Sequence, residues 1–282
     1  MSLVVCNTID QLRQHLSSER SMGRSIGFVP TMGALHQGHI SLMETALDET
    51  SIVVSSIFIN PTQFNDPKDL ERYPRTPEKD LKLLEDAGCH YVFMPDAKEI
   101  YPDNDVLQDI NFGNLDKVME GAYRPAHFKG VATVVDKLFR IVEPHCAYFG
   151  EKDFQQLTII RYLVQKLNHR IKIVGCPTLR ETDGLAMSSR NQLLTAEQRN
   201  AAPVIYKALK ESTYWIKEFP IEEVKKKVIE IIDISPFLKV QYFEIVNSIT
   251  LENVLLYNES QPTRGCIAVL TDGPRLIDNI AY

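Results

Sequence analysis

Hydrophobic and polar positions follow two different periods along the first 175 residues. Short apolar runs rich in β-branched residues predict strands at 25–29, 52–59, 91–94, 147–149 and 171–175. Between them, apolar residues recur at offsets of three and four, most clearly in the stripe Val131, Val134, Val135, Leu138 and Val142. Short strands separated by helical patterns are typical of βαβ units. This part of the chain is therefore predicted to be an α/β domain with a Rossmann-like, doubly wound parallel sheet.

The pattern changes near residues 179–187. Thr195 and Gln198 have the spacing of a capping box, which predicts a long helix running toward Trp215. Pro220 is expected to start a second helix, whose inner face would be Ile221, Val224, Val228, Ile231 and Ile232. Alternating runs follow as VQYFEIVN, CIAVLT and RLIDNIA, which predict antiparallel strands. We therefore expect two domains, a Rossmann-like domain at 1–183 and a smaller α+β domain at 184–282.

Composition narrows the class of protein. With 44% hydrophobic and 24% charged residues, the 282-residue chain reads as an ordinary globular protein, and no apolar segment approaches the length of a membrane span. The net charge of -6 argues against general nucleic-acid binding. Five scattered cysteines without a C-x-x-C pair are typical of free thiols in a reducing cytosol. We expect a cytoplasmic protein with no membrane or nucleic-acid partner.

The stretch FVPTMGALHQGH, residues 28–39, joins the first strand to the first helix of this pattern. Pro30 is expected to stop the strand, and the helix to begin around 35–39. The loop would then lie at the carboxyl end of a parallel strand, where open α/β sheets bind ligands. The N-terminus of a helix at this position offers unpaired N–H groups to an anion.

Glycines and histidines in this loop carry the candidate chemistry. Gly33 and Gly38 have no side chains, so a phosphate could approach the backbone closely at these positions. His36 and His39 are three residues apart and would face one side of the first helical turn. The spacing alone is equally compatible with two solvated histidines and a turn glycine.

Three further stretches follow strand ends or join the domains. FINPTQF follows the second strand and presents the neutral amides of Asn60 and Gln63. FGEKDFQQ follows the fourth strand and brings Lys152 and Asp153. GLAMSSRN places two hydroxyls and Arg190 between the domains, where they suit a phosphate clamp. Each of these stretches alone is also compatible with a turn or a solvated surface. Their convergence on one edge of the sheet indicates a ligand-binding site.

With these motifs assembled, the chain resembles the pantothenate synthetase (pantoate–β-alanine ligase) family. The segments PTMGALHQGH, NPTQF, YPRT, RPAHFKGV, YFGEKDFQQL and DGLAMSSRN occur in the family's order and approximate spacing. The His-x-Gly-His element by itself also marks many nucleotidylyltransferases and class I aminoacyl-tRNA synthetases. The chain departs from the family at Ala126, where glycine is usual.

The resemblance implies an ATP-dependent condensation in two steps, within pantothenate and coenzyme A biosynthesis. The carboxylate of (R)-pantoate attacks the α-phosphorus of ATP, which gives pantoyl adenylate and diphosphate with the help of Mg²⁺. The amine of β-alanine then attacks the acyl carbon and expels AMP. The resemblance also implies that 1–183 binds ATP and pantoate, that 184–282 acts as a lid, and that the enzyme is a cytoplasmic homodimer.

The resemblance further implies a set of site residues. The catalytic residues would be His36, His39, Lys152 and Arg190, with His39 as proton donor to the departing diphosphate. The ATP site would be lined by Met32, Gly33, Ala34, Leu35, His36, Gln37, Gly38, His39, Gly150, Glu151, Lys152, Asp153, Leu179, Met187, Ser188, Ser189 and Arg190. Substrate contacts would come from Gln63, Gln156, Asn60, Tyr73 and Arg124. Asp80 is the candidate for the metal neighbourhood.

Other functions stay open at this point. A nucleotidylyltransferase acting on a phosphorylated small molecule should carry basic residues where this chain has Asn60, Gln63 and Gln156. A non-catalytic nucleotide-binding regulator should show a damaged motif, whereas both histidines, Lys152 and Arg190 are present. A tRNA synthetase would need a large anticodon-binding region, for which the acidic chain has no room.

Overall fold

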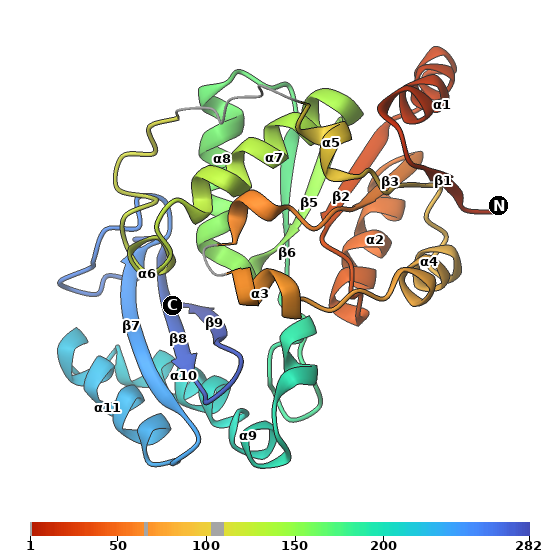
Figure 1. The fold of residues 1–282 in the computed structure, drawn as a ribbon. Coiled ribbons are helices and arrows are strands. Elements are labelled where there is room, and N and C mark those ends of the chain that lie inside the picture. The colour runs from red at the N-terminus through yellow and green to blue at the C-terminus, as the bar shows by residue number, and fades with distance from the viewer. Residues whose placement is uncertain (1, 65–66, 103–109) are drawn as a thin grey trace. The chain divides into compact units, whose positions relative to one another are not determined.

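The computed structural model describes residues 2–64, 67–102 and 110–282, and its course is drawn in Figure 1. The chain divides into two compact units, and both are discontinuous in sequence. The first unit holds Met1–Phe112, Arg124–Glu151 and Ile159–Pro177, and the second holds Gly113–Tyr123, Lys152–Thr158 and Thr178–Tyr282. The domain boundary expected near residue 183 stays a prediction.

The first unit is built on a parallel sheet. Within the described residues it has six strands in the order β1-β4-β3-β2-β5-β6. They are β1 (Val4–Cys6), β2 (Ile26–Thr31), β3 (Ile52–Ile57), β4 (Tyr91–Phe93), β5 (Cys146–Gly150) and β6 (Lys172–Cys176). All neighbouring pairs run parallel, which confirms the predicted α/β fold. The short β1 was not predicted.

Helices cover both faces of this sheet (Figure 1). Successive residues of β2 point to opposite faces. Val29 packs in one buried cluster with Met43 of α2 (Gln37–Glu49), while Phe28 meets Phe139 of α7 (His127–Val142) with ring centroids 6.4 Å apart. These helices therefore lie on opposite sides of β2. The helical segments along this part of the chain are α1 (Ile9–Ser21), α2 (Gln37–Glu49), η1 (Pro61–Gln63), α3 (Pro67–Arg72), α4 (Pro77–Asp86), α5 (Ala97–Ile100), α7 (His127–Val142), η2 (Glu151–Asp153) and α8 (Phe154–Lys166).

Strand β2 runs through Pro30, contrary to the expectation that the proline would stop it. Pro30 pairs with Ser56 and Thr31 with Ile57 in the parallel register with β3. On its other side β2 pairs with β5 only through Gly27 and Phe28. Beyond Phe28 the strand thus has one partner, and an edge position tolerates a residue without an N–H group.

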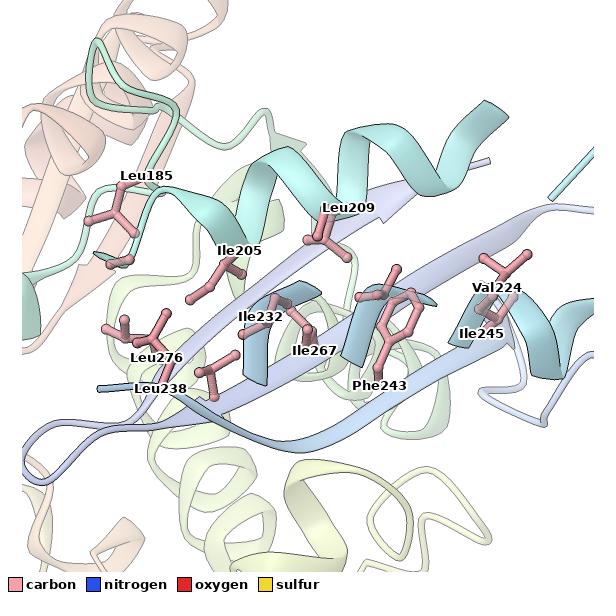
Figure 2. Close-up of a cluster of buried hydrophobic side chains, with 14 of the residues drawn as sticks. Leu185, Ile205, Leu209, Val224, Ile232, Leu238, Phe243, Ile245, Ile267 and Leu276 are labelled. Atoms are coloured by element: carbon pink, nitrogen blue, oxygen red, sulfur yellow. The ribbon is translucent and has the colours of Figure 1, made fainter. Parts of the chain in front are cut away.

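The second unit contains an antiparallel sheet, as predicted for the C-terminal region. Its strands are β7 (Lys239–Asn247), β8 (Thr263–Leu270) and β9 (Leu276–Ala281), in that order. Its helical segments are α6 (Glu120–Tyr123), η3 (Ser189–Leu193), α9 (Ala196–Ala201), α10 (Val204–Trp215) and α11 (Ile221–Asp233). Figure 2 shows side chains from helices and strands meeting in one apolar core, among them Ile205, Leu209, Val224, Ile232, Phe243 and Ile267.

The long helix predicted from Thr195 toward Trp215 is two helices. The capping box of Thr195 and Gln198 is confirmed, but α9 ends at Ala201 and α10 begins at Val204. Pro203 lies at the break, because proline lacks an N–H group and its ring clashes with the preceding turn. The second predicted helix is confirmed as α11, with Ile231 only partly buried at the edge of its inner face.

The cysteines form no disulfide, as expected. Cys6, Cys89, Cys176 and Cys266 are buried and Cys146 is half-buried, all as free thiols. Burial raises the pKa of both the Cys89 and the Cys266 thiol to about 12. Across the described residues, no helix combines the length and the apolar character needed to cross a membrane.

Candidate active site

Three adjacent strands carry the predicted motifs to one edge of the parallel sheet. The segments that follow β3, β2 and β5 leave from the carboxyl ends of strands that lie side by side. After β2 the chain adds β3 and β4 on one side, and later β5 and β6 on the other. The order therefore reverses beside β2, and such a switch point is where open α/β sheets bind ligands.

The loop after β2 is held by Asp80 of α4. The backbone N–H groups of Ala34 and Leu35 donate to its Oδ2 and Oδ1 at 2.9 and 2.8 Å, and the Thr76 hydroxyl donates to Oδ1 at 3.1 Å. Gly33 and Ala34 both have positive φ, 81° and 51°. A Cβ on Gly33 would lie 3.0 Å from Asp80 Oδ2, so glycine fits both the conformation and the contact.

His36 and His39 form a reciprocal cap at the start of α2. His36 Nδ1 accepts the N–H of Gly38 at 3.1 Å, and His39 Nδ1 accepts the N–H of His36 at 3.3 Å. The ring centroids lie 4.2 Å apart, so the two imidazoles share one side as predicted. Because each Nδ1 accepts a backbone N–H, the neutral rings carry their proton on Nε2. Both rings can therefore donate a hydrogen bond from Nε2 to an anion.

The contacts of Asp80 fit a structural role better than the predicted metal role. The side chain is 1% exposed, and both carboxylate oxygens accept hydrogen bonds from the protein. Among the described residues, no group of three or more His, Cys, Asp or Glu side chains could hold a metal ion. Mg²⁺ is commonly bound through few carboxylates together with substrate phosphates.

Asn60 and Gln63, predicted to bind substrate, contact each other in and beside η1. Asn60 is 1% exposed, and its Nδ2 donates to Gln63 Oε1 at 3.1 Å and to the Gly130 carbonyl at 3.2 Å. Its Oδ1 accepts the Tyr101 hydroxyl at 2.9 Å. Tyr101 was not predicted, because it lies 41 residues from Asn60 in sequence and no periodicity connects them.

Arg124 is linked to Gln63 by His127, a residue that was not predicted. His127 is 7% exposed, and its Nδ1 lies 2.8 Å from the Gln63 carbonyl, which can only accept. The proton is therefore on Nδ1, and Nε2 can accept from the Arg124 guanidinium at 3.3 Å. Tyr73 is also buried and packs edge-on against Phe64, the residue after Gln63.

The next group of predicted site residues follows β5 in the chain. Lys152 Nζ lies 3.5 Å from Asp153 Oδ1, and the Lys152 carbonyl accepts from Asn279 at 2.9 Å. Gln156 is half-buried on α8. Its neighbour Gln155 is structural, because its side-chain amide donates to the carbonyls of Leu115 and Val118.

The DGLAMSSRN motif forms a short folded turn in the second unit. The Met187 N–H donates to the Leu179 carbonyl at 3.0 Å, so these two predicted residues are neighbours. Ser188 caps η3 by accepting the Arg190 N–H at 3.3 Å. Ser189 is buried and Arg190 half-buried.

A paired-histidine helix start at the switch point of a parallel sheet is typical of a nucleotide-binding α/β enzyme. The model of the pantoate-beta-alanine ligase family matches residues 4–281. The pantothenate synthetase of Bacteroides thetaiotaomicron is 48% identical over 278 residues, which is 99% of this chain and 98% of that protein. The chain belongs to the pantoate–β-alanine ligase family, and it is a ligase.

Solved structures agree with this membership. The crystal structure of pantothenate synthetase from Thermus thermophilus matches with a TM-score of 0.92 at 41% identity, covering 98% of both chains. That of pantoate-beta-alanine ligase from Francisella tularensis, complexed with beta-gamma ATP and beta-alanine, matches with a TM-score of 0.82 at 36% identity. It covers 99% of this chain and 97% of the other.

Proposed function

We propose that this chain condenses (R)-pantoate with β-alanine, consuming ATP and forming pantothenate, AMP and diphosphate through pantoyl adenylate. Family membership over nearly the whole chain supports the overall reaction. The structural observation that carries the proposal is the reciprocal cap of His36 and His39, which places both imidazoles on one side of the start of α2, with Nε2–H as the donor group of each neutral ring. Such donors suit a substrate that carries phosphate groups.

The first step has to bring a carboxylate to a polyanion. Each pair of unit charges 4 Å apart costs about 4 kcal/mol at an effective dielectric near 20. The α2 N-terminus and the two Nε2–H groups offset part of this repulsion, and the family resemblance adds the cations Lys152 and Arg190. Mg²⁺ bound to the triphosphate would neutralise further phosphate charge. In this step the bond between pantoate oxygen and α-phosphorus forms, the bond from α-phosphorus to the bridging oxygen breaks, and diphosphate leaves, its charge stabilised by a hydrogen bond from His39 Nε2–H.

The second step transfers the pantoyl group to nitrogen. The amine of β-alanine attacks the acyl carbon, the C–N bond forms, the bond to the AMP oxygen breaks, and the proton lost by the amine passes to the released phosphate of AMP or to water. Gln63 and Gln156 are assigned to pantoate by the family resemblance, which also places Gln63 near β-alanine, and Asn60 is assigned a supporting role. Tyr73 and Arg124 are assigned as further substrate contacts. In support, Tyr73 packs against Phe64, the residue after Gln63, and Arg124 contacts His127, which binds the Gln63 carbonyl.

The wider setting is also proposed. We assign the enzyme to the cytoplasm as a homodimer in which 184–282 acts as a lid, on the family resemblance. The free thiols support a reducing compartment.

A nucleotidylyltransferase is the alternative. It would move a nucleotide onto a phosphorylated acceptor, and the neutral amides of Asn60 and Gln63 after β3 do not suit such an acceptor. The deciding experiment is an assay of AMP release from ATP. Release that requires both pantoate and β-alanine supports the ligase, whereas a stable dinucleotide product would support the alternative.

A further inference from the structure

We infer that Tyr101 is a positioning residue, which acts through Asn60 to fix the direction of the Gln63 amide so that its NH₂ group faces the substrate. The inference rests on the proposed function, because Gln63 binds substrate there. It adds a residue to that site and states which half of the Gln63 amide the substrate meets. The relevant groups are Tyr101, Asn60, Thr62, Gln63, Met32 and Gly130, all in the first unit.

Two backbone groups show which way the Asn60 amide is turned. The Thr62 N–H, which can only donate, lies 3.3 Å from Oδ1. The Gly130 carbonyl, which can only accept, lies 3.2 Å from Nδ2. Turning the Asn60 amide over would set NH₂ against N–H and oxygen against oxygen. With the side chain buried, neither mismatch would be relieved by water.

The orientation of Gln63 follows from that of Asn60. Since Asn60 Nδ2 donates to Gln63 Oε1 at 3.1 Å, the NH₂ end of Gln63 is directed to the other side. It lies 3.0 Å from the sulfur of Met32, at the start of the loop that carries the two histidines. A thioether sulfur is a weak acceptor, and a carboxylate is a strong one. The geometry therefore suits an acceptor such as the pantoate carboxylate and disfavours a donor.

Tyr101 is hydrogen-bonded to the other end of the Asn60 amide. We call the chain of hydrogen bonds from Tyr101 through Asn60 to Gln63 the relay. Its hydroxyl lies 2.9 Å from Asn60 Oδ1, and because that oxygen can only accept, the hydroxyl donates. The Thr62 hydroxyl donates to the same oxygen at 3.0 Å. The Tyr101 ring is held by Phe58, with centroids 6.3 Å apart, and lies under the ammonium of Lys137 at 5.4 Å. The fixed ring holds the hydroxyl beside Asn60 Oδ1 and 3.3 Å from Thr62 Oγ1, which is already committed as a donor to the same Asn60 oxygen.

Gly130 lets α7, whose Gly130 carbonyl accepts the Asn60 hydrogen bond, come close to η1. A Cβ at this position would collide with the Thr62 carbonyl, so a side chain would separate α7 from η1. His127, three residues earlier on α7, holds the Gln63 backbone carbonyl at 2.8 Å. Backbone and side chain of Gln63 are thus both positioned by buried hydrogen bonds.

The test is Tyr101→Phe, which removes the hydroxyl and keeps the ring. We expect the KM for pantoate to rise by about five- to tenfold, the effect of one lost buried hydrogen bond, while the KM for ATP stays within about twofold. The matched control is Tyr91→Phe on β4, which removes a tyrosine hydroxyl that donates to Glu19 at 2.6 Å. The control should lose comparable thermal stability and leave the KM for pantoate unchanged.

A second variant tests the direction of the relay. In Asn60→Asp the side chain keeps its acceptors but cannot donate to Gln63 Oε1. The Gln63 amide is then free to turn, and kcat/KM for pantoate should fall by more than in Tyr101→Phe. Should Tyr101→Phe fail to fold, Thr62→Val removes the other hydroxyl donor to Asn60 and should show the same split between the two KM values.

The outcomes separate this inference from the proposed function. An unmodified enzyme that releases no AMP in response to pantoate and β-alanine contradicts the proposed function. An active enzyme whose folded Tyr101→Phe variant keeps its KM for pantoate, or changes both KM values equally, overturns the relay alone.

Discussion

The carboxylate of Asp80 accepts the backbone N–H of Leu35 at 2.8 Å, although 45 residues separate the two in sequence. Through this bond, and the one to Ala34, α4 sets the shape of the loop that leads into His36. The positive φ of Ala34 costs roughly 1–2 kcal/mol for a residue other than glycine. The two hydrogen bonds to a buried carboxylate are what hold the loop in that conformation.

Replacing Asp80 should therefore destabilise the fold. In Asp80→Ala two buried N–H groups lose their acceptor, and the free energy of unfolding should fall by roughly 2–4 kcal/mol. Asp80→Asn keeps one acceptor and should lose about half as much. Urea unfolding measures both. The control is Asp86→Asn on the same helix, whose partner Lys82 is exposed, and it should change stability by less than about 0.5 kcal/mol.

The same variants test the metal role of Asp80. If Asp80 only holds the loop, Asp80→Asn should lower activity without altering the Mg²⁺ concentration needed for half-maximal rate. A rise of tenfold or more in that concentration, in a folded variant, would show that Asp80 takes part in binding Mg²⁺.

His39→Ala should abolish most adenylate formation. Loss of a proton donor or phosphate contact typically costs about 10²–10⁴-fold in rate. The variant should still fold, because losing the bond to the His36 N–H costs only about 0.5–2 kcal/mol as a helix cap. Pyrophosphate release and circular dichroism measure the two effects, with the exposed His15→Ala as control. Near-normal release by a folded His39→Ala protein would remove His39 from the mechanism.

The buried thiols should be inert in the native protein. Burial raises the pKa of Cys89 and Cys266 from 9.0 to about 12, so both stay protonated at pH 8. A disulfide reagent should modify half-buried Cys146 before either of them, and all five cysteines once denaturant is added. Modification of Cys89 or Cys266 at the rate of Cys146 would contradict their burial.

The same shifts give a pH dependence of stability. Between pH 9 and about 12 the native thiols hold protons that the unfolded chain has lost. The stability they contribute is complete below pH 9 and declines as the pH rises through that window. The melting temperature should therefore fall from pH 9 upward, and more gently in Cys89→Ala.

Periodicity predicted the elements whose pattern is long or strongly one-sided. The apolar stripe of α7 and the strands β2 to β6 were found in this way. Three-residue β1 is too short to show a period, and Pro203 divides a helix without changing the apolar pattern around it. The end of β2 was misplaced because the effect of Pro30 depends on which strands lie beside it.

The candidate site was predictable only where its residues are close in sequence. His36 and His39 belong to one helical turn, and Asn60 and Gln63 to another. The pairs Asp80 with Leu35, Tyr101 with Asn60 and His127 with Gln63 are separated by 45, 41 and 64 residues. Such pairs arise only from the packing of elements, which no local spacing encodes.

The departure at Ala126 also has a structural meaning. Ala126 precedes α7 with φ of 62°, in the left-handed region where glycine carries no penalty. Glycine, usual in the family, suits that conformation, and alanine adopts it here at a cost of about 1–2 kcal/mol.

The central claim is that attack at phosphorus precedes attack at carbon, and a rapid-quench experiment tests it most directly. Enzyme mixed with ATP, Mg²⁺ and pantoate, without β-alanine, should release diphosphate in a burst of about one equivalent per active site. The burst should then stop, since the adenylate stays bound and shielded from water. Adding β-alanine should yield AMP and the amide. Diphosphate release that depends strictly on β-alanine would contradict the adenylate mechanism.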